Sequence, residues 1–180
     1  MALKTIHKDY SDPLVQKSLY RVLRENVLCS MSTVSTGHRA YVNTAYFCHS
    51  PQLELFFLSD PESFHCRNLA QNPSMAIAVF RSDQTWGHPD RGVQLFGICR
   101  EARGSVAERA GRLYSSRFPP FSKLLSGTSA VARKQARLLL SYRFYRFVAN
   151  RVKILDEREF GGGVFVLTNV PRSAQPVRER

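Results

Sequence analysis

Short runs in which apolar residues alternate with polar or small ones dominate this sequence, and this two-residue period is typical of β-strands. Turn-forming residues such as Gly, Pro, Asn and Asp separate seven of these runs. The predicted strands are 27–33, 39–47, 53–58, 75–80, 93–102, 142–155 and 160–170. Most of their connections are too short for a parallel crossover, so we expect antiparallel pairing.

A helical period begins after Asp12-Pro13, where the side chain of Asp12 can cap free N–H groups and Pro13 suits the first helical position. The apolar residues that follow share one helical face: Leu14, Val15, Leu19, Val22 and Leu23. We therefore expect an amphipathic helix of about four turns that packs on the core.

A second, short helix is predicted between the third and fourth strands. Asp60-Pro61 repeats the start signal, and Asn72-Pro73 ends the helix because a residue before proline avoids the helical region. A helix that begins directly after a strand can hold a phosphate at its free N–H groups. The segment 57–81 is therefore the first candidate for a binding site.

Helices also follow the fifth strand. A capping box from Ser105 to Glu108 predicts a helix that ends near Arg117, whereas residues 126–137 are compatible with helix or loop. Residues 1–10 resemble a loose leader. The whole pattern predicts a mainly β fold, a closed or partly closed β-barrel with flanking helices. We expect one domain over residues 1–170 and a disordered tail over 171–180.

Positive charge is concentrated in the second half of the chain. The net charge is +12, yet residues 1–99 carry 9 Lys and Arg against 8 Asp and Glu, whereas residues 100–180 carry 17 against 6. Nucleic-acid binding would explain such an excess. The basic residues are dispersed and form no compact block, so a solvated face is the favoured explanation.

Other classes of site have little support. The four cysteines form no CxxC pair and the five histidines show no metal-ligand spacing, so we expect reduced thiols and no metal site. An apolar leader and an apolar stretch long enough to span a bilayer are both missing. We therefore expect a cytoplasmic protein without a membrane partner.

The order of these motifs resembles the pyridoxamine 5'-phosphate oxidase-like, FMN-binding split-barrel superfamily. The resemblance covers roughly residues 14–168 and is carried by Ser63, Asn68-Leu69, Asn72-Pro73 and a strand with Gly97 that follows a Trp-containing loop. The second half, with RLYSSRFPPFSKLL and RVKILDEREFGGG, is similar to a small bacterial subgroup. The resemblance implies a six- to seven-stranded antiparallel split β-barrel, and a homodimer that holds FMN at the subunit interface.

The resemblance also implies which residues contact the cofactor. The isoalloxazine ring would be bordered by Val42, Asn43 and Thr44. The end of the third strand would supply Leu58 and Ser59, and the loop before the fifth strand would supply Arg91. Ser63 and His65 would reach the phosphate, and Arg67, one helical turn on, could add a positive charge.

This sequence departs from the oxidase pattern around the phosphate. The oxidases carry two basic residues after the position of Ser63, where this chain has Phe64 and His65, and the acids Asp60 and Glu62 would lie in the first helical turn. Pyridoxamine phosphate oxidation is therefore not expected. The remaining hypotheses are an FMN-dependent oxidoreductase with a small-molecule substrate, a flavin- or ligand-binding barrel without turnover, and a basic nucleic-acid-binding barrel.

Overall fold

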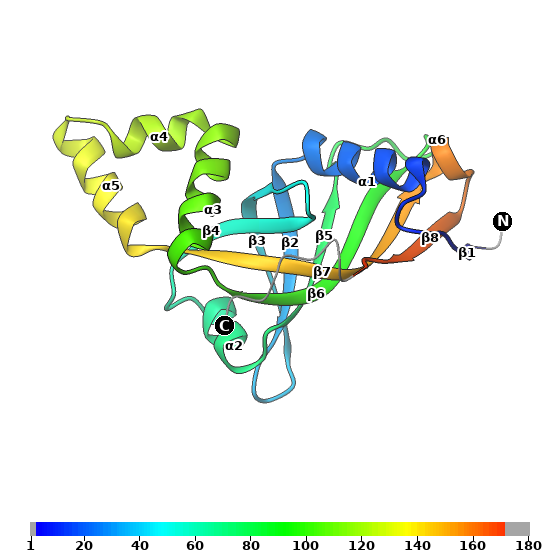
Figure 1. The fold of residues 1–180 in the computed structure, drawn as a ribbon, viewed down its shortest axis with the longest axis horizontal. Coiled ribbons are helices and arrows are strands. Elements are labelled where there is room, and N and C mark those ends of the chain that lie inside the picture. Colours follow the sequence, from blue (N-terminus) through cyan, green and yellow to red (C-terminus); the bar gives the residue numbers. More distant parts are fainter. Residues whose placement is uncertain (1–2, 172–180) are drawn as a thin grey trace.

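The computed structural model describes residues 3–171 and shows a β-barrel with flanking helices (Figure 1). Its strands are β1 Lys4–His7, β2 Leu28–Val34, β3 Ala40–His49, β4 Glu54–Ser59, β5 Ser74–Phe80, β6 Arg91–Glu101, β7 Arg143–Asp156 and β8 Val164–Asn169. Its helices are α1 Pro13–Glu25, α2 Phe64–Gln71, α3 Gly104–Arg117, α4 Pro119–Leu125, α5 Ala130–Ser141 and α6 Glu157–Phe160.

Six strands close into the barrel in the order β7-β4-β3-β2-β5-β6, and β6 pairs back onto β7. Every one of these pairings is antiparallel. The long strand β7 pairs with β4 over its first half and with β8 over its second half, so that β8 and β1 extend the sheet beyond the barrel. The predicted mainly β, antiparallel split barrel is thus confirmed.

The first ten residues are not a loose leader, as the sequence suggested. Within them, β1 pairs in parallel with β8, from Lys4 opposite Val164 to His7 opposite Leu167. This pairing partner lies some 160 residues away in the sequence, and local patterns carry no information about it. Of the predicted tail, all but Pro171 lies outside the described residues.

Helix α1 forms as the local signals predict. Asp12 Oδ1 accepts hydrogen bonds from the backbone N–H groups of Leu14 (2.8 Å) and Val15 (3.4 Å), and Pro13 occupies the first turn. Leu19 and Leu23 are fully buried in the main core. Leu14, by contrast, is exposed, so the buried stripe is narrower than predicted.

Helices α2 and α3 begin at residues other than those predicted. Asp60 accepts a hydrogen bond from the Glu62 N–H (2.9 Å) within a turn, and α2 starts only at Phe64. The acids Asp60 and Glu62 therefore lie before the first helical turn. Helix α3 starts at Gly104 with Arg103 at its N-cap, so Ser105 lies inside the helix and not at the predicted cap position. The ambiguous segment 126–137 contributes most of helix α5.

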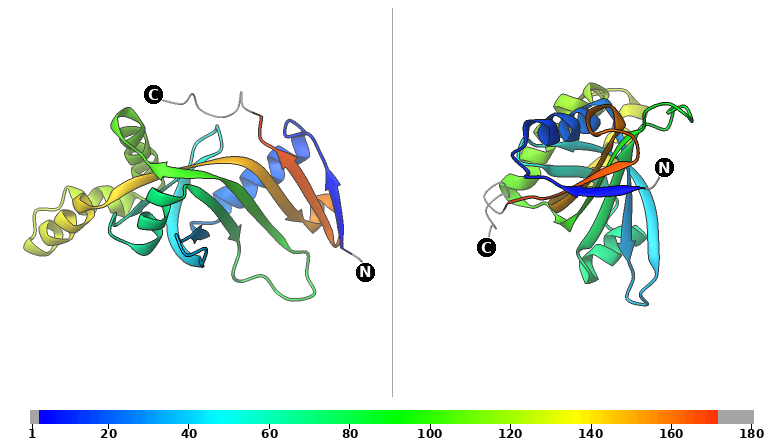
Figure 2. Two further views of the ribbon diagram at one scale, coloured as in Figure 1. Left: turned by 90° about the horizontal axis from the view of Figure 1, so that it is seen from below. Right: turned by 90° about the vertical axis from the view of Figure 1, so that its right-hand side faces the viewer.

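Helix α3 lies against the outside of the barrel and encloses a second core with Cys48, Phe56 and Tyr114 among its members. From the end of α3, helices α4 and α5 form a hairpin that extends away from the barrel before β7 returns to it (Figure 1). Figure 2 shows the same projection from below. No helix among residues 3–171 is long and apolar enough to cross a membrane.

Gly97 allows β6 and β7 to approach closely at the bulge that shifts their register. A Cβ atom at this position would lie 2.1 Å from the carbonyl oxygen of Val148. We expect Gly97→Ala to lower the free energy of unfolding by about 2–4 kcal/mol, because backbone must move. Gly111→Ala in α3 is the matched control, since its Cβ would meet Phe144 at 3.7 Å and alanine favours helix. Denaturant titrations of both variants test this, and an equal response would contradict it.

Candidate functional site

One outward side of the barrel, formed by β3, β2, β5 and β6, carries rows of small side chains open to solvent; we call it the open sheet face. The registers place Thr44, Ser30, Ala78 and Gln94 in one row. Val42, Ser32, Ala76 and Phe96 form the next row, and Arg151 of β7 continues it. Because Ser and Ala fill the middle of both rows, the open sheet face has a shallow floor.

Two hollows lie on this face. The larger, of about 580 Å³, is lined by Ser32, Ser74, Ala76, Phe96 and Arg151 among others, and the Arg151 guanidinium lies 4.7 Å from the centre of the Phe96 ring. The smaller, of about 330 Å³, is lined by Ala78, Phe80, Gln94 and Lys153 among others. An aromatic ring and a cation thus border a floor of small residues, an arrangement that suits a flat, anionic ligand.

The residues expected at the isoalloxazine ring divide between the two sides of β3. Val42, which is 75 % exposed, and Thr44 belong to the open sheet face. Asn43 points to the opposite side, where it is partly buried opposite Met31. Leu58 of β4 is half-buried and packs on the core beneath α3. Of the three residues expected at the ring, only Val42 and Thr44 therefore share one surface, and Leu58, expected at the end of the third strand, lies away from them.

Three residues predicted from the resemblance do meet, at the junction of β4 and α2. His65 Nε2 lies 2.8 Å from Ser59 Oγ and 3.3 Å from Ser63 Oγ, and we call this group the serine–histidine cluster. Burial lowers the pKa of His65 below its ordinary value, so the imidazole is neutral at pH 7. The cluster offers two hydroxyls and an imidazole, all of which can donate hydrogen bonds to an anion.

Helix α2 is fixed by contacts on its inner side. Asn68 Nδ2 donates to Thr33 Oγ1 of β2 (3.1 Å), and both residues are buried. Cys66 and Leu69 lie in the main core. This attachment sets the position of the serine–histidine cluster relative to the β2–β3 hairpin.

Arg67 makes a different contact from the one the resemblance implies. Its guanidinium lies 4.8 Å from the centre of the Phe64 ring, and Tyr41 stacks on that ring at 6.0 Å with an interplanar angle of 5°. Phe64 is nevertheless 66 % exposed. Sequence reasoning overlooked Phe64 and Tyr41 as a pair, although an aromatic residue in place of a family cation was a usable signal.

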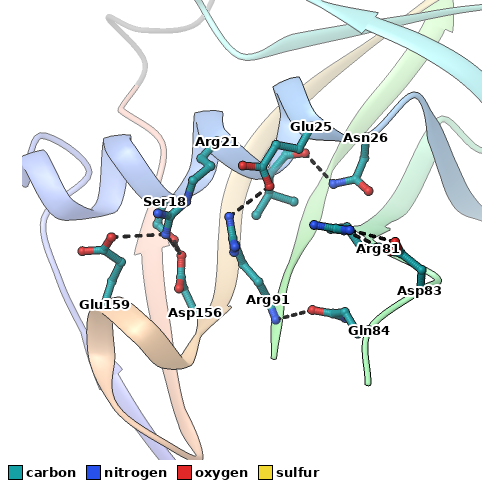
Figure 3. Close-up of polar contacts among 11 residues, drawn as sticks. Ser18, Arg21, Glu25, Asn26, Arg81, Asp83, Gln84, Arg91, Asp156 and Glu159 are labelled. Atoms are coloured by element: carbon teal, nitrogen blue, oxygen red, sulfur yellow. Dashed lines mark hydrogen bonds and ion pairs between the residues drawn. The ribbon is translucent and has the colours of Figure 1, made fainter. Parts of the chain in front are cut away.

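Arg91 lies at the opposite end of the barrel from the serine–histidine cluster. It pairs across the sheet with Asp156 at the end of β7, whereas Ser59 pairs with Arg143 at its beginning. The length of β7 separates them by roughly 40 Å along the strand. The Nη1 of Arg91 donates to Glu25 Oε2 (2.9 Å) in the polar network beside α1 (Figure 3). Within one chain Arg91 therefore cannot join the cluster.

Comparison with known proteins places the fold but gives no relative by sequence. No protein-family profile matches the chain, and no curated protein matches it. A heme-binding protein from Mycobacterium smegmatis superposes with a TM-score of 0.66 at 14 % identity, over 88 % of this chain and 60 % of the other. A Listeria innocua protein provisionally assigned as a pyridoxamine 5'-phosphate oxidase gives 0.57 at 15 % identity, over 78 % and 98 %.

A third solved structure, an FAD-binding protein from Mesorhizobium loti, superposes with a TM-score of 0.53 at 18 % identity, over 74 % of this chain and 88 % of the other. Identities this low relate the folds and not the ligands. The split barrel predicted from the sequence resemblance is therefore the fold that this chain shares with pyridoxamine 5'-phosphate oxidase-like, flavin-binding and heme-binding proteins.

Proposed function

We propose that this chain binds FMN on the open sheet face and, as a homodimer, acts as a flavin-dependent oxidoreductase on a small molecule. The shallow floor formed by Ser30, Ser32, Ala76 and Ala78 carries the proposal. A planar ring can lie flat on side chains this small, while Phe96 and Arg151 border it at one end. FMN would supply the redox chemistry, and the protein would position it and limit its contact with water.

The serine–histidine cluster lies on the Thr33 side of β2, opposite to the floor, and is the proposed phosphate site of a flavin held between two copies of the chain. Ser59 and Ser63 can each donate an O–H, and His65 gains a positive charge when it takes up a proton. The first turn of α2 holds no acid, since Asp60 and Glu62 precede it. Asp60 and Glu62 therefore repel a phosphate at this helix terminus less than they would if the helix began at Pro61.

A second copy of the chain is the proposed cover for the open sheet face. Large apolar side chains remain exposed on it, namely Leu28, Val42, Tyr46, Phe80 and Ile98. Exposed apolar patches of this kind mark interaction surfaces. A second copy would also be the only source of an Arg91 near the serine–histidine cluster.

Flavin suits the open sheet face better than heme does. The two rows that cross it contain no His, Cys or Met that could ligate an iron from the floor. The first test is the absorbance spectrum of the purified protein and an FMN titration. A flavin spectrum that NAD(P)H bleaches supports the oxidoreductase hypothesis. A flavin spectrum that NAD(P)H does not bleach favours a flavin-binding barrel without turnover. A Soret band, or no thermal stabilisation by FMN, contradicts the proposal.

His65→Ala should weaken FMN binding by about tenfold, because one hydrogen bond to a charged group is lost. Because the phosphate stabilises the protonated form of His65, FMN binding is accompanied by proton uptake. The affinity of the unmutated protein for FMN should therefore fall as pH rises from about 6 to about 8. The variant should lose that dependence. Fluorescence titration at several pH values measures both effects.

His88→Ala is the matched control for His65→Ala. His88 is exposed in the β5–β6 loop, and its removal should leave both the affinity and its pH dependence unchanged. An unaltered pH dependence in His65→Ala would show that another group recognises the phosphate.

A further inference from the structure

The hairpin of α4 and α5, residues 119–141, stands away from the barrel and is here called the helical arm (Figures 1 and 2). It lies within a stretch that has no Asp or Glu between Glu108 and Asp156. The same stretch holds eleven basic residues: Arg109, Arg112, Arg117, Lys123, Arg133, Lys134, Arg137, Arg143, Arg146, Arg151 and Lys153. Neither the flavin site nor the main core uses the arm, although Phe121 of α4 packs on the second core.

Several of these cations have structural roles outside the arm. Arg109 and Arg146 pair with Glu54, and Arg117 donates to the backbone carbonyls of Leu23 and Asn26 at the C-terminal end of α1. On the arm the situation differs. Within residues 3–171, none of Lys123, Arg133, Lys134 and Arg137 forms an ion pair with a carboxylate.

Helix α5 also leaves apolar side chains in water beside these cations. Ala136 is its buried residue, and Ala132 and Leu139 share that side by helical spacing. On the solvent side Val131 is 68 % exposed and Leu138 57 % exposed. Lys134 lies between them at the spacing of one helical face, and Leu140 is exposed next to Arg133 and Arg137. The solvent side of α5 is therefore both cationic and apolar.

We infer that the helical arm is a docking surface for an anionic membrane, with Arg133, Lys134 and Arg137 at the lipid headgroups and Val131 and Leu138 inserted at the acyl boundary. A helix with this mixture lies in the plane of a bilayer surface. Such peripheral contact needs no spanning segment, and it departs from the sequence-based expectation of a protein without a membrane partner. Nucleic acid would match the charge but would leave the exposed valine and leucines unused. A second copy of the chain would bring the arm's cations against a protein of net charge +12.

Vesicle flotation tests the inference with the whole protein. Vesicles of phosphatidylcholine with about a third phosphatidylserine should bind it at least tenfold more tightly than pure phosphatidylcholine, and salt should weaken binding. Each arm cation should contribute about fivefold. Replacing Arg133, Lys134 and Arg137 together with Gln should therefore weaken binding about 100-fold. The matched control replaces Lys4, Arg39 and Arg158, three exposed cations outside the arm, and should change it much less.

A fluorescence reporter separates insertion from simple charge attraction. The chain has one tryptophan, Trp86, which is 97 % exposed in the β5–β6 loop at the far end of β6 from the arm. In a Trp86→Phe, Leu138→Trp variant, the anionic vesicles should shift the emission to the blue, while Trp86 in the unmutated protein should show no shift.

Three outcomes overturn the inference. The first is equal loss of vesicle binding in the arm variant and in the charge-matched control. The second is binding of a single-stranded RNA that depends on the arm cations, without binding to anionic vesicles. The third is a dimer that dissociates when the arm cations are replaced, which would assign the arm to contact between two copies of the chain.

Discussion

Glu54→Gln should lower the free energy of unfolding by about 3–5 kcal/mol. Glu54 is fully buried at the start of β4, and its two carboxylate oxygens accept hydrogen bonds from both terminal nitrogens of Arg109. Arg146 Nε lies 3.2 Å from the carboxylate, and Ser50 Oγ donates to it at 2.9 Å. An uncharged amide would leave two partly exposed guanidinium groups beside each other without the buried counter-charge. Chemical denaturation at fixed protein concentration measures the loss.

Glu62→Gln is the matched control for Glu54→Gln. Glu62 is exposed in the turn before α2, so the same chemical change should alter stability by no more than about 0.5 kcal/mol. A loss below about 1 kcal/mol in Glu54→Gln would mean that the site takes up water or rearranges. The ion network would then not be what holds α3, and the helical arm beyond it, to the barrel.

Ala76→Trp should abolish FMN binding, with affinity reduced by at least about 100-fold. Ala76 lies in the middle of the floor, between Ser32 on one neighbouring strand and Phe96 on the other. An indole ring there would occupy the volume that the proposed flavin needs, and it would stand in the way of a second copy of the chain. Equilibrium titration with FMN and the molar mass by light scattering measure the two effects.

Lys4→Trp controls for the general effect of adding a large aromatic ring to an exposed strand position. Lys4 is exposed on β1, outside the open sheet face, and its replacement should change neither FMN affinity nor molar mass. If Ala76→Trp still binds FMN, the flavin does not lie on the open sheet face, even when the purified protein shows a flavin spectrum. If Ala76→Trp loses FMN binding but keeps the monomer–dimer balance, the flavin site stands as proposed. The dimer contact would then lie on another surface.

Local signals were sufficient where a short stretch satisfies its own backbone. Asp12 and Pro13 start α1 as expected, because the carboxylate that caps the helix is adjacent in sequence. The alternation along 142–155 likewise predicted β7, whose residues alternate between core and surface over most of its length. The same kind of signal was misleading at Asp60-Pro61, where the aspartate stabilises a turn and the helix begins at Phe64.

The candidate site depended more on tertiary structure. Ser59, which the resemblance placed at the end of the third strand, lies beside Ser63 and His65, because the three are within seven residues of one another. It did not anticipate that Arg67 would lie on the ring of Phe64, or that Arg91 would pair with Glu25 at the far end of the barrel. Those contacts depend on which side of a strand or helix faces which neighbour.

By itself, the sequence determined seven of the eight strands in residues 3–171, the first helix, the antiparallel barrel and the positive charge of the second half, because periodicity, capping and composition are local properties. Only the tertiary structure decided the pairing of β1 with β8, the closure of β6 onto β7, the rows of the open sheet face and the projection of the helical arm. Each of these needs the register between segments far apart in the chain, and that register is set by closing the barrel and burying its core.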